Sequence, residues 1–166
     1  MHSNSLQKLY IDELKTLHNA ELQVLRTIPK LAMAASDETL RETLAHQGHQ
    51  AQEHIACIER LLGELDETPQ GRKSAAMEGM LKDSVEMMKD KRDSSALDAA
   101  LIAHAQDIEH FQIAKYGTVR AWARRLGYDN QARKLEDCLR EETEADRALT
   151  QIAESAVNLR AAAQPA

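Results

Sequence analysis

The chain has 166 residues and a formal net charge of −6, with 26 alanines and 16 glutamates but only five aromatic residues, six glycines and three prolines. Good helix formers dominate, so the composition predicts one all-α domain and argues against a β-sandwich or barrel. The acidic balance argues against a nucleic-acid partner. No apolar run approaches the roughly 20 residues that a membrane-spanning helix needs.

The cysteines and the first residues bear on the compartment. Cys57 and Cys138 form neither a CxxC pair nor a disulfide framework. Residues 1–5 lack the apolar core of a secretory signal. We therefore expect a cytoplasmic protein in which both thiols are reduced.

Three breaks divide the chain into four long helices and one shorter one. In chain order, the expected helices cover residues 6–35, 38–63, 74–89, 95–126 and 130–159. Ser36 or Asp37 can cap the second helix, Gly127 follows a basic last turn, and Asp129 or Asn130 can cap the last helix. We expect a single domain over residues 1–160 and a frayed tail over residues 161–166.

The connections between these helices predict the topology. The first and last links are short, and short links between long helices make antiparallel hairpins. The central connection takes roughly 30 residues, carries the short extra helix and can cross the length of a bundle. Short, long and short links predict a ferritin-like four-helix bundle with one long crossover.

Several polar residues lie on the apolar stripes of these helices when positions are spaced at about 100° per residue. Glu21, Glu109 and Glu142 lie near the centres of their stripes, Asp146 lies within about 60° of its stripe, and Gln50 lies at an edge. His54 lies on the stripe of the second helix. The candidate inward-facing residues are Glu21, Gln50, His54, Glu109, Glu142 and Asp146.

Buried carboxylates of this number need a counter-charge. An ionised carboxylate removed from water costs many kcal/mol unless it is paired or bound to a metal, and Arg120 is the one basic candidate near these stripes. Each candidate lies 14 to 19 residues from the turn of its hairpin, so the candidates agree in height within about one helical turn. Two divalent first-row metals, iron or manganese, held by carboxylates and an imidazole would fit this arrangement.

The pattern departs from the common di-metal bundle, in which two helices each supply Glu-x-x-His. This chain offers Gln50-x-x-x-His54 and Glu142-x-x-x-Asp146. A weaker amide or water then replaces one carboxylate, which leaves full two-metal occupancy and oxygen chemistry open. The structural alternatives are a salt-bridged core acid for any single glutamate and a hydrogen-bonded core histidine for His54.

Several sequence blocks carry a family likeness. Residues 76–81 read AMEGML and residues 98–118 read DAALIAHAQDIEHFQIAKYGT. Together with residues 19–21, 28–32 and 157–158, they resemble the YciF/YciE family of bacterial ferritin-like proteins over almost the whole chain. The resemblance implies a ferritin-like fold, a link to bacterial stress responses and a homodimer. Many members carry Glu at the position of Gln50, and His54 replaces a frequent Gln.

Two functional hypotheses follow. The first is a stress-response protein that binds iron or manganese in the bundle core and oxidises Fe(II) or reduces peroxide. Glu21, Glu109 and Glu142 would be the principal ligands and His54 the terminal imidazole, with Gln50 and Asp146 as weaker ligands. The second is a non-enzymatic helical dimer whose buried acids form a protonated network. An iron-storage cage is a third possibility.

Overall fold

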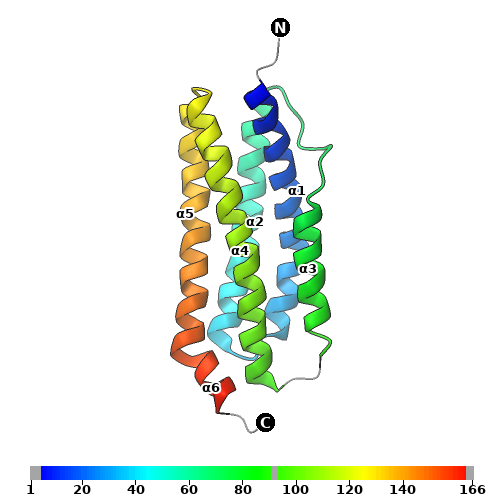
Figure 1. The fold of residues 1–166 in the computed structure, drawn as a ribbon, viewed down its shortest axis with the longest axis vertical. Coiled ribbons are helices and arrows are strands. Elements are labelled where there is room, and N and C mark those ends of the chain that lie inside the picture. Colours follow the sequence, from blue (N-terminus) through cyan, green and yellow to red (C-terminus); the bar gives the residue numbers. More distant parts are fainter. Residues whose placement is uncertain (1–4, 91–92, 164–166) are drawn as a thin grey trace.

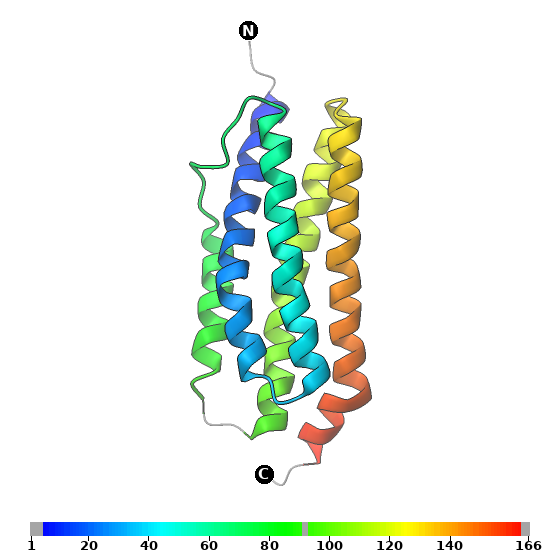
Figure 2. The same cartoon turned by 180° about the vertical axis from the view of Figure 1, so that it is seen from behind.

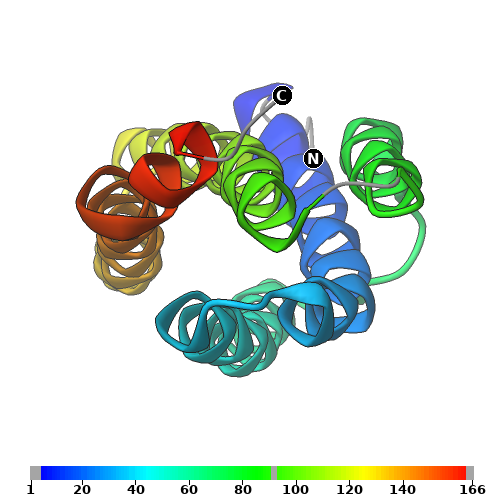
Figure 3. The ribbon, with the colours of Figure 1, turned by 90° about the horizontal axis from the view of Figure 1, so that it is seen from below.

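The computed structural model describes residues 5–90 and 93–163, and every regular element within those ranges is helical. Four long helices make the bundle: α1 (Ser5–Ala34), α2 (Glu38–Gly63), α4 (Ser94–Arg125) and α5 (Asp129–Ile152) (Figure 1). The shorter α3 (Ala75–Met87) packs outside the bundle against α1 and α4 (Figure 3). The predicted ferritin-like fold is confirmed.

The chain direction follows from the connections. Helices α1 and α2 form one antiparallel hairpin, and α4 and α5 form the other (Figure 1). The long crossover with α3 brings the chain back along the bundle, so α4 starts at the same end as α2. Helix α5 consequently packs beside α2 as well as α4, as Figure 2 shows from behind.

Local signals define most helix ends. The Asp37 side chain accepts the N–H of Leu40 at 2.9 Å, and Ser74 caps α3 in the same way. Gly127 has φ +78°, a left-handed conformation that glycine adopts easily after a helix. The start of α5 differs from the prediction, because Tyr128 is the N-cap residue, its side chain makes no capping hydrogen bond, and Asp129 is already helical.

A buried carboxylate ties the two hairpins together at one end of the bundle. Asp98, 3 % exposed, accepts the N–H groups of Ser36 and Asp37 at 2.8 and 2.9 Å. These two donors belong to the turn between α1 and α2, whereas Asp98 lies in the first turns of α4. The contact therefore fixes the position of one hairpin against the other.

The sequence predicts one continuous last helix over residues 130–159, but the structure divides this stretch into three segments. Helix α5 ends at Ile152, a π-helical turn covers Ala153–Val157, and α6 covers Asn158–Ala162. A π-helical turn inserts an extra residue, which changes the direction that later side chains face. Part of the predicted frayed tail, residues 164–166, lies outside the described residues. Within the described ranges, no helix is long and apolar enough to cross a membrane.

The core has an apolar cluster at each end of the bundle and a polar layer between them. One cluster includes Leu17 and Ile58, and the other includes Val24 and Leu149. Each long helix contributes a buried carboxyl or imidazole group to this layer. These residues are Glu21 on α1, His54 on α2, Glu109 on α4 and Glu142 on α5.

Candidate metal centre

Three side chains from three helices converge in the polar layer. One potential ligand atom from each of Glu21, His54 and Glu142 lies within 4.8 Å of the others. These residues are 0, 2 and 5 % exposed, so their charged groups are removed from solvent. Among the described residues, this is the one group of three or more acidic, histidine or cysteine side chains whose ligand atoms lie close enough together to hold a metal ion.

The imidazole of His54 has a different environment at each nitrogen. Its Nε2 bonds to Oε2 of Glu141 at 2.8 Å. Its Nδ1 lies 3.0 Å from Oε1 of Glu142 and 3.5 Å from Oε1 of Glu21. Neither contact has the geometry of a hydrogen bond. Nδ1 is therefore buried without a hydrogen-bond partner. Metal-binding histidines commonly bond to a carboxylate through the second nitrogen, which leaves the first for the ion.

Other polar atoms in this layer also lack partners. Oε2 of Glu21 and Oε2 of Glu109 are buried without hydrogen bonds. The other Glu21 oxygen accepts the hydroxyl of Tyr116 at 2.6 Å. Within residues 5–90 and 93–163, no lysine or arginine forms an ion pair with Glu21, Glu109 or Glu142. Orphaned carboxylate oxygens beside an orphaned imidazole nitrogen are the donor set that a divalent cation would fit.

Without a cation, protons compensate the buried charge. Burial raises the pKa of Glu109 to about 11, and the neighbouring charge of Glu142 and contact with it add to the rise. Burial also raises the pKa of Glu21, against the opposing contact with His54. For His54, burial lowers the pKa, but the contacts with Glu142 and Glu21 outweigh it and raise the pKa to about 11. A metal ion at this position therefore has to compete with protons.

The predicted site residues fall into two groups. Glu21, His54 and Glu142 come together, and Glu109 contacts Glu142. Asp146 instead accepts a hydrogen bond from Gln106 at 3.1 Å. It also lies 3.4 Å from Nδ1 of His110, with its side chain 20 % exposed. Because Asp146 lies away from the centre of its stripe, its side chain points towards α4 and lies outside the cluster of Glu21, His54 and Glu142.

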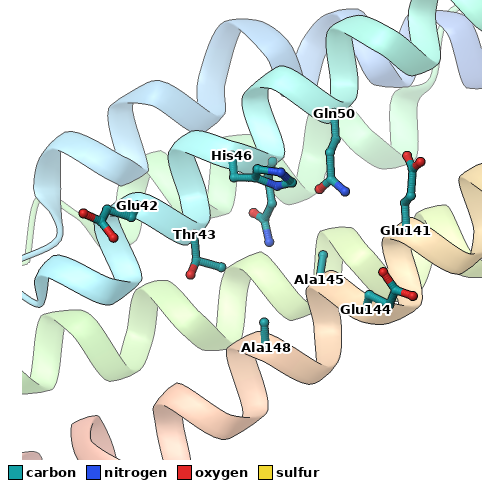
Figure 4. Close-up of a pocket in the computed structure, with 9 residues that line it drawn as sticks. Glu42, Thr43, His46, Gln50, Glu141, Glu144, Ala145 and Ala148 are labelled. Carbon is teal, nitrogen blue, oxygen red and sulfur yellow. The ribbon is translucent and has the colours of Figure 1, made fainter.

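Gln50 lies in a groove between α2 and α5. The groove has a volume of about 460 Å³ and is lined by Glu42, Thr43, His46, Gln47, Gln50, Glu141, Glu144, Ala145 and Ala148. Figure 4 shows His46 and Gln50 on α2 facing Glu141 and Glu144 on α5. Gln47 is 5 % exposed, and neither atom of its amide has a partner. Because Glu141 also bonds to His54, the groove lies beside the buried centre.

Helical periodicity did not identify Glu141 as a residue of the site. It precedes the inward-facing Glu142 by one position, about 100° around the helix, so periodicity places it towards solvent. A signal was nevertheless present, since a buried histidine ligand needs a partner for its second nitrogen. Searching the neighbours of Glu142 for that partner identifies Glu141.

The fold and the site together define a ferritin-like helical bundle with a candidate carboxylate and histidine metal centre. Residues 5–162 match the family described as a domain of unknown function, DUF892, and the chain belongs to this family. It is 33 % identical to Protein YciF from Escherichia coli strain K12 over 162 residues, covering 97 % of this chain and 98 % of that protein.

Solved structures agree with this assignment. The crystal structure of the E. coli stress protein YciF matches with a TM-score of 0.89, covering 94 % of this chain and 99 % of that one at 33 % identity. YcfI from Rhodopseudomonas palustris, described only as a candidate structural protein, matches with a TM-score of 0.87 and 32 % identity, covering 90 % of this chain and 96 % of that one. A protein from Xanthomonas campestris, at 18 % identity, covers 94 % of this chain and 95 % of that one with a TM-score of 0.71 and supports the fold alone.

Proposed function

We propose that this protein binds a divalent metal ion between Glu21, His54 and Glu142, as part of a bacterial stress response. The observation that carries the proposal is the set of partnerless atoms in the polar layer: Nδ1 of His54 and one oxygen each of Glu21 and Glu109. A buried polar atom without a partner costs about 1–3 kcal/mol. A bound cation removes that cost at several atoms together.

Iron or manganese suits this donor set best. Carboxylate oxygens with one imidazole are typical ligands of both metals, whereas a structural zinc site usually includes cysteine thiolates. A second ion is the fuller form of the proposal, with Glu109 as a ligand and Gln50 and Asp146 as weaker ones. Gln50 lies in the neighbouring groove and Asp146 bonds to Gln106, so both side chains would have to turn inward. When bound, iron would supply one-electron chemistry with oxygen or peroxide, and the groove beside Glu141 would admit small reactants.

The test is anaerobic Fe(II) titration of tag-free protein, followed by exposure to oxygen or peroxide and monitored by optical absorbance. We expect stoichiometric binding, and greatly weakened binding in Glu21→Gln and Glu142→Gln. Glu154→Gln is the matched control, because Glu154 is exposed and lies in the π-helical turn that follows α5, 12 residues beyond Glu142. Uptake well below one ion per chain for both iron and manganese would contradict the proposal.

The second candidate function is a structural helical protein without a functional metal. The observation that favours it is His54, whose raised pKa makes it an internal cation between Glu21 and Glu142 in the metal-free protein. The similar protein YcfI is described as a candidate structural protein. Under this alternative, added metal leaves the melting temperature unchanged, whereas an ion that binds the native state raises it.

We also propose a homodimer located in the cytoplasm. An apolar groove across α1 and α2, lined in part by Leu25, Pro29 and the 85 % exposed Met33, supports an association surface. The two unpaired cysteines support a reducing compartment. Sedimentation equilibrium measures the first claim and fractionation of the source cells measures the second; a monomer, or recovery outside the cytoplasm, contradicts the respective claim.

A further inference from the structure

Two cysteines lie opposite each other one helical turn from the metal centre. Cys57 is on α2 and Cys138 is on α5; both belong to the same buried cluster and line the same pocket, and each thiol affects the pKa of the other. The two helices run antiparallel and pack side by side (Figure 2). Cys57 follows His54 by three positions and Cys138 precedes Glu142 by four. The pair therefore joins the two helices that carry these ligands.

The pair is reachable from solvent by small molecules. Cys57 and Cys138 are 8 and 5 % exposed, yet both line a surface pocket of about 210 Å³. Arg60 and Lys134 contribute positive charge to the wall of the same pocket. The same wall also carries Glu53, Asp137 and Glu141, so the charges of the pocket are mixed, and a pocket of this size admits a small neutral oxidant such as hydrogen peroxide.

The two sulfurs have different chemical character. Contact with Cys138 lowers the pKa of Cys57 to about 7 against the opposing effect of burial, and the charge of Arg60 also lowers it. The same contact, together with burial, raises the pKa of Cys138 far above the ordinary value. The lower pKa favours Cys57 as the nucleophile and leaves Cys138 as the thiol that would resolve its oxidised form.

We propose that Cys57 and Cys138 form a peroxide-sensitive thiol pair that closes into a disulfide between α2 and α5. The Cys57 thiolate attacks one oxygen of hydrogen peroxide, the O–O bond breaks, and the departing hydroxide takes up the proton that the thiol lost and becomes water. Cys57 is now a sulfenic acid, oxidised by two electrons. The Cys138 sulfur then attacks the Cys57 sulfur, and its proton leaves with the hydroxyl group as a second water.

This inference is independent of the metal. The sulfur chemistry needs peroxide and the two thiols, and a cellular dithiol would reverse it by exchange. Its position has a consequence for the centre, because the disulfide would fix the spacing of the helices beside His54 and Glu142. A protein that binds metal but leaves its thiols reduced contradicts this inference alone. A protein that forms the disulfide but binds no metal contradicts the proposed function alone.

The experiment treats chelator-washed, full-length protein with hydrogen peroxide, blocks remaining thiols under denaturing conditions and maps tryptic peptides by mass spectrometry. We expect both thiols to disappear and peptide 42–60 to become linked to peptide 135–140, with dithiothreitol releasing them. Non-reducing electrophoresis should show no chain-to-chain link. Oxidation of the 85 % exposed Met33 confirms that oxidant was present.

Two variants separate the roles. In Cys138→Ser, Cys57 should stop at the sulfenic acid and react with dimedone; in Cys57→Ser, Cys138 should stay a thiol. The inference is overturned if both wild-type thiols survive while Met33 is oxidised, or if the disulfide joins two chains. Failure of dimedone to label Cys57 in Cys138→Ser also overturns it. The wild-type peptide map needs no variant to fold.

Discussion

Nε2 of His54 bonds to Oε2 of Glu141 at 2.8 Å, and this bond connects the buried centre to the groove between α2 and α5. The His54 side chain is 2 % exposed, whereas that of Glu141 is 36 % exposed. The bond orients the imidazole so that Nδ1 faces Glu21 and Glu142. A residue near the surface thereby sets the geometry of a buried one.

The first prediction concerns Glu141→Gln. An amide can still bond to His54, but it lacks the negative charge that makes the imidazole a better ligand. Loss of such a supporting carboxylate typically lowers metal affinity by about 10- to 100-fold. Titration with Fe(II) or Mn(II) measures the change. The control is Glu144→Gln, which removes a charge from the same groove without a bond to His54; equal weakening in both variants would reject the orienting role.

The second prediction concerns Glu109→Gln in metal-free protein. The Glu109 carboxyl is buried beside Glu142, which raises its pKa to about 11. Near neutral pH the folded protein therefore holds this carboxyl protonated, whereas the unfolded chain ionises it, so folding has to bind a proton. A neutral amide removes that cost, and we expect the free energy of unfolding to rise by about 1–2 kcal/mol. Denaturant unfolding measures this rise. Metal binding should weaken in the same variant, and unchanged binding would remove Glu109 from the ligand set.

The third prediction concerns pH. The pKa of His54 rises from 6.5 to about 11 on folding, so the native state holds this proton more tightly than the unfolded chain does. The stability that His54 contributes is complete below pH 6.5 and is lost as the pH rises towards about 11. Glu109 acts in the same direction, with a pKa raised from 4.5 to about 11.

We therefore expect the melting temperature of chelator-treated protein to fall with rising pH across this window. His54→Gln should flatten the fall, because the amide has no proton to lose. A slope identical to that of the wild type would show that His54 is not the internal cation. Addition of metal should release protons, which a pH indicator in weakly buffered solution detects.

The central layer of the bundle could be predicted from the sequence because helical phase is reliable within long, uninterrupted helices. Four residues assigned to the interior by phase, Glu21, His54, Glu109 and Glu142, are all buried. Asp146 was assigned within about 60° of its stripe, and its side chain bonds to Gln106 outside the cluster. Phase gives the direction of a Cα–Cβ bond, whereas the last atoms of a long side chain follow their local partners.

Other features depend on contacts that a single helix does not encode. The π-helical turn at Ala153–Val157 interrupts a stretch whose residues all suit an ordinary helix. The bond from Glu141 to His54 joins positions 87 residues apart, so only the packing of α2 against α5 creates it. The pairing of Cys57 with Cys138 has the same origin. The sequence therefore predicts which helix carries each residue, but the partner of that residue depends on how the neighbouring helix packs.

The last prediction compares two buried tyrosines. Tyr116 donates its hydroxyl to Glu21 at 2.6 Å, and Tyr10 donates to Gln131 at 2.7 Å, away from the centre. Replacing either by Phe leaves a buried acceptor without its donor, which should lower the free energy of unfolding by about 1–3 kcal/mol. Only Tyr116→Phe changes the charge balance of the centre.

The Tyr116 hydroxyl stabilises the ionised form of Glu21, so its loss should raise the pKa of Glu21 further. Protons then compete more strongly for the carboxylate, and metal affinity near neutral pH should fall in Tyr116→Phe but not in Tyr10→Phe. Raising the pH should restore part of the lost affinity, since deprotonation removes the competitor. Paired titrations at two pH values measure this. If Tyr10→Phe weakens metal binding as much as Tyr116→Phe, the effect comes from general loosening of the bundle rather than from the Glu21 carboxylate.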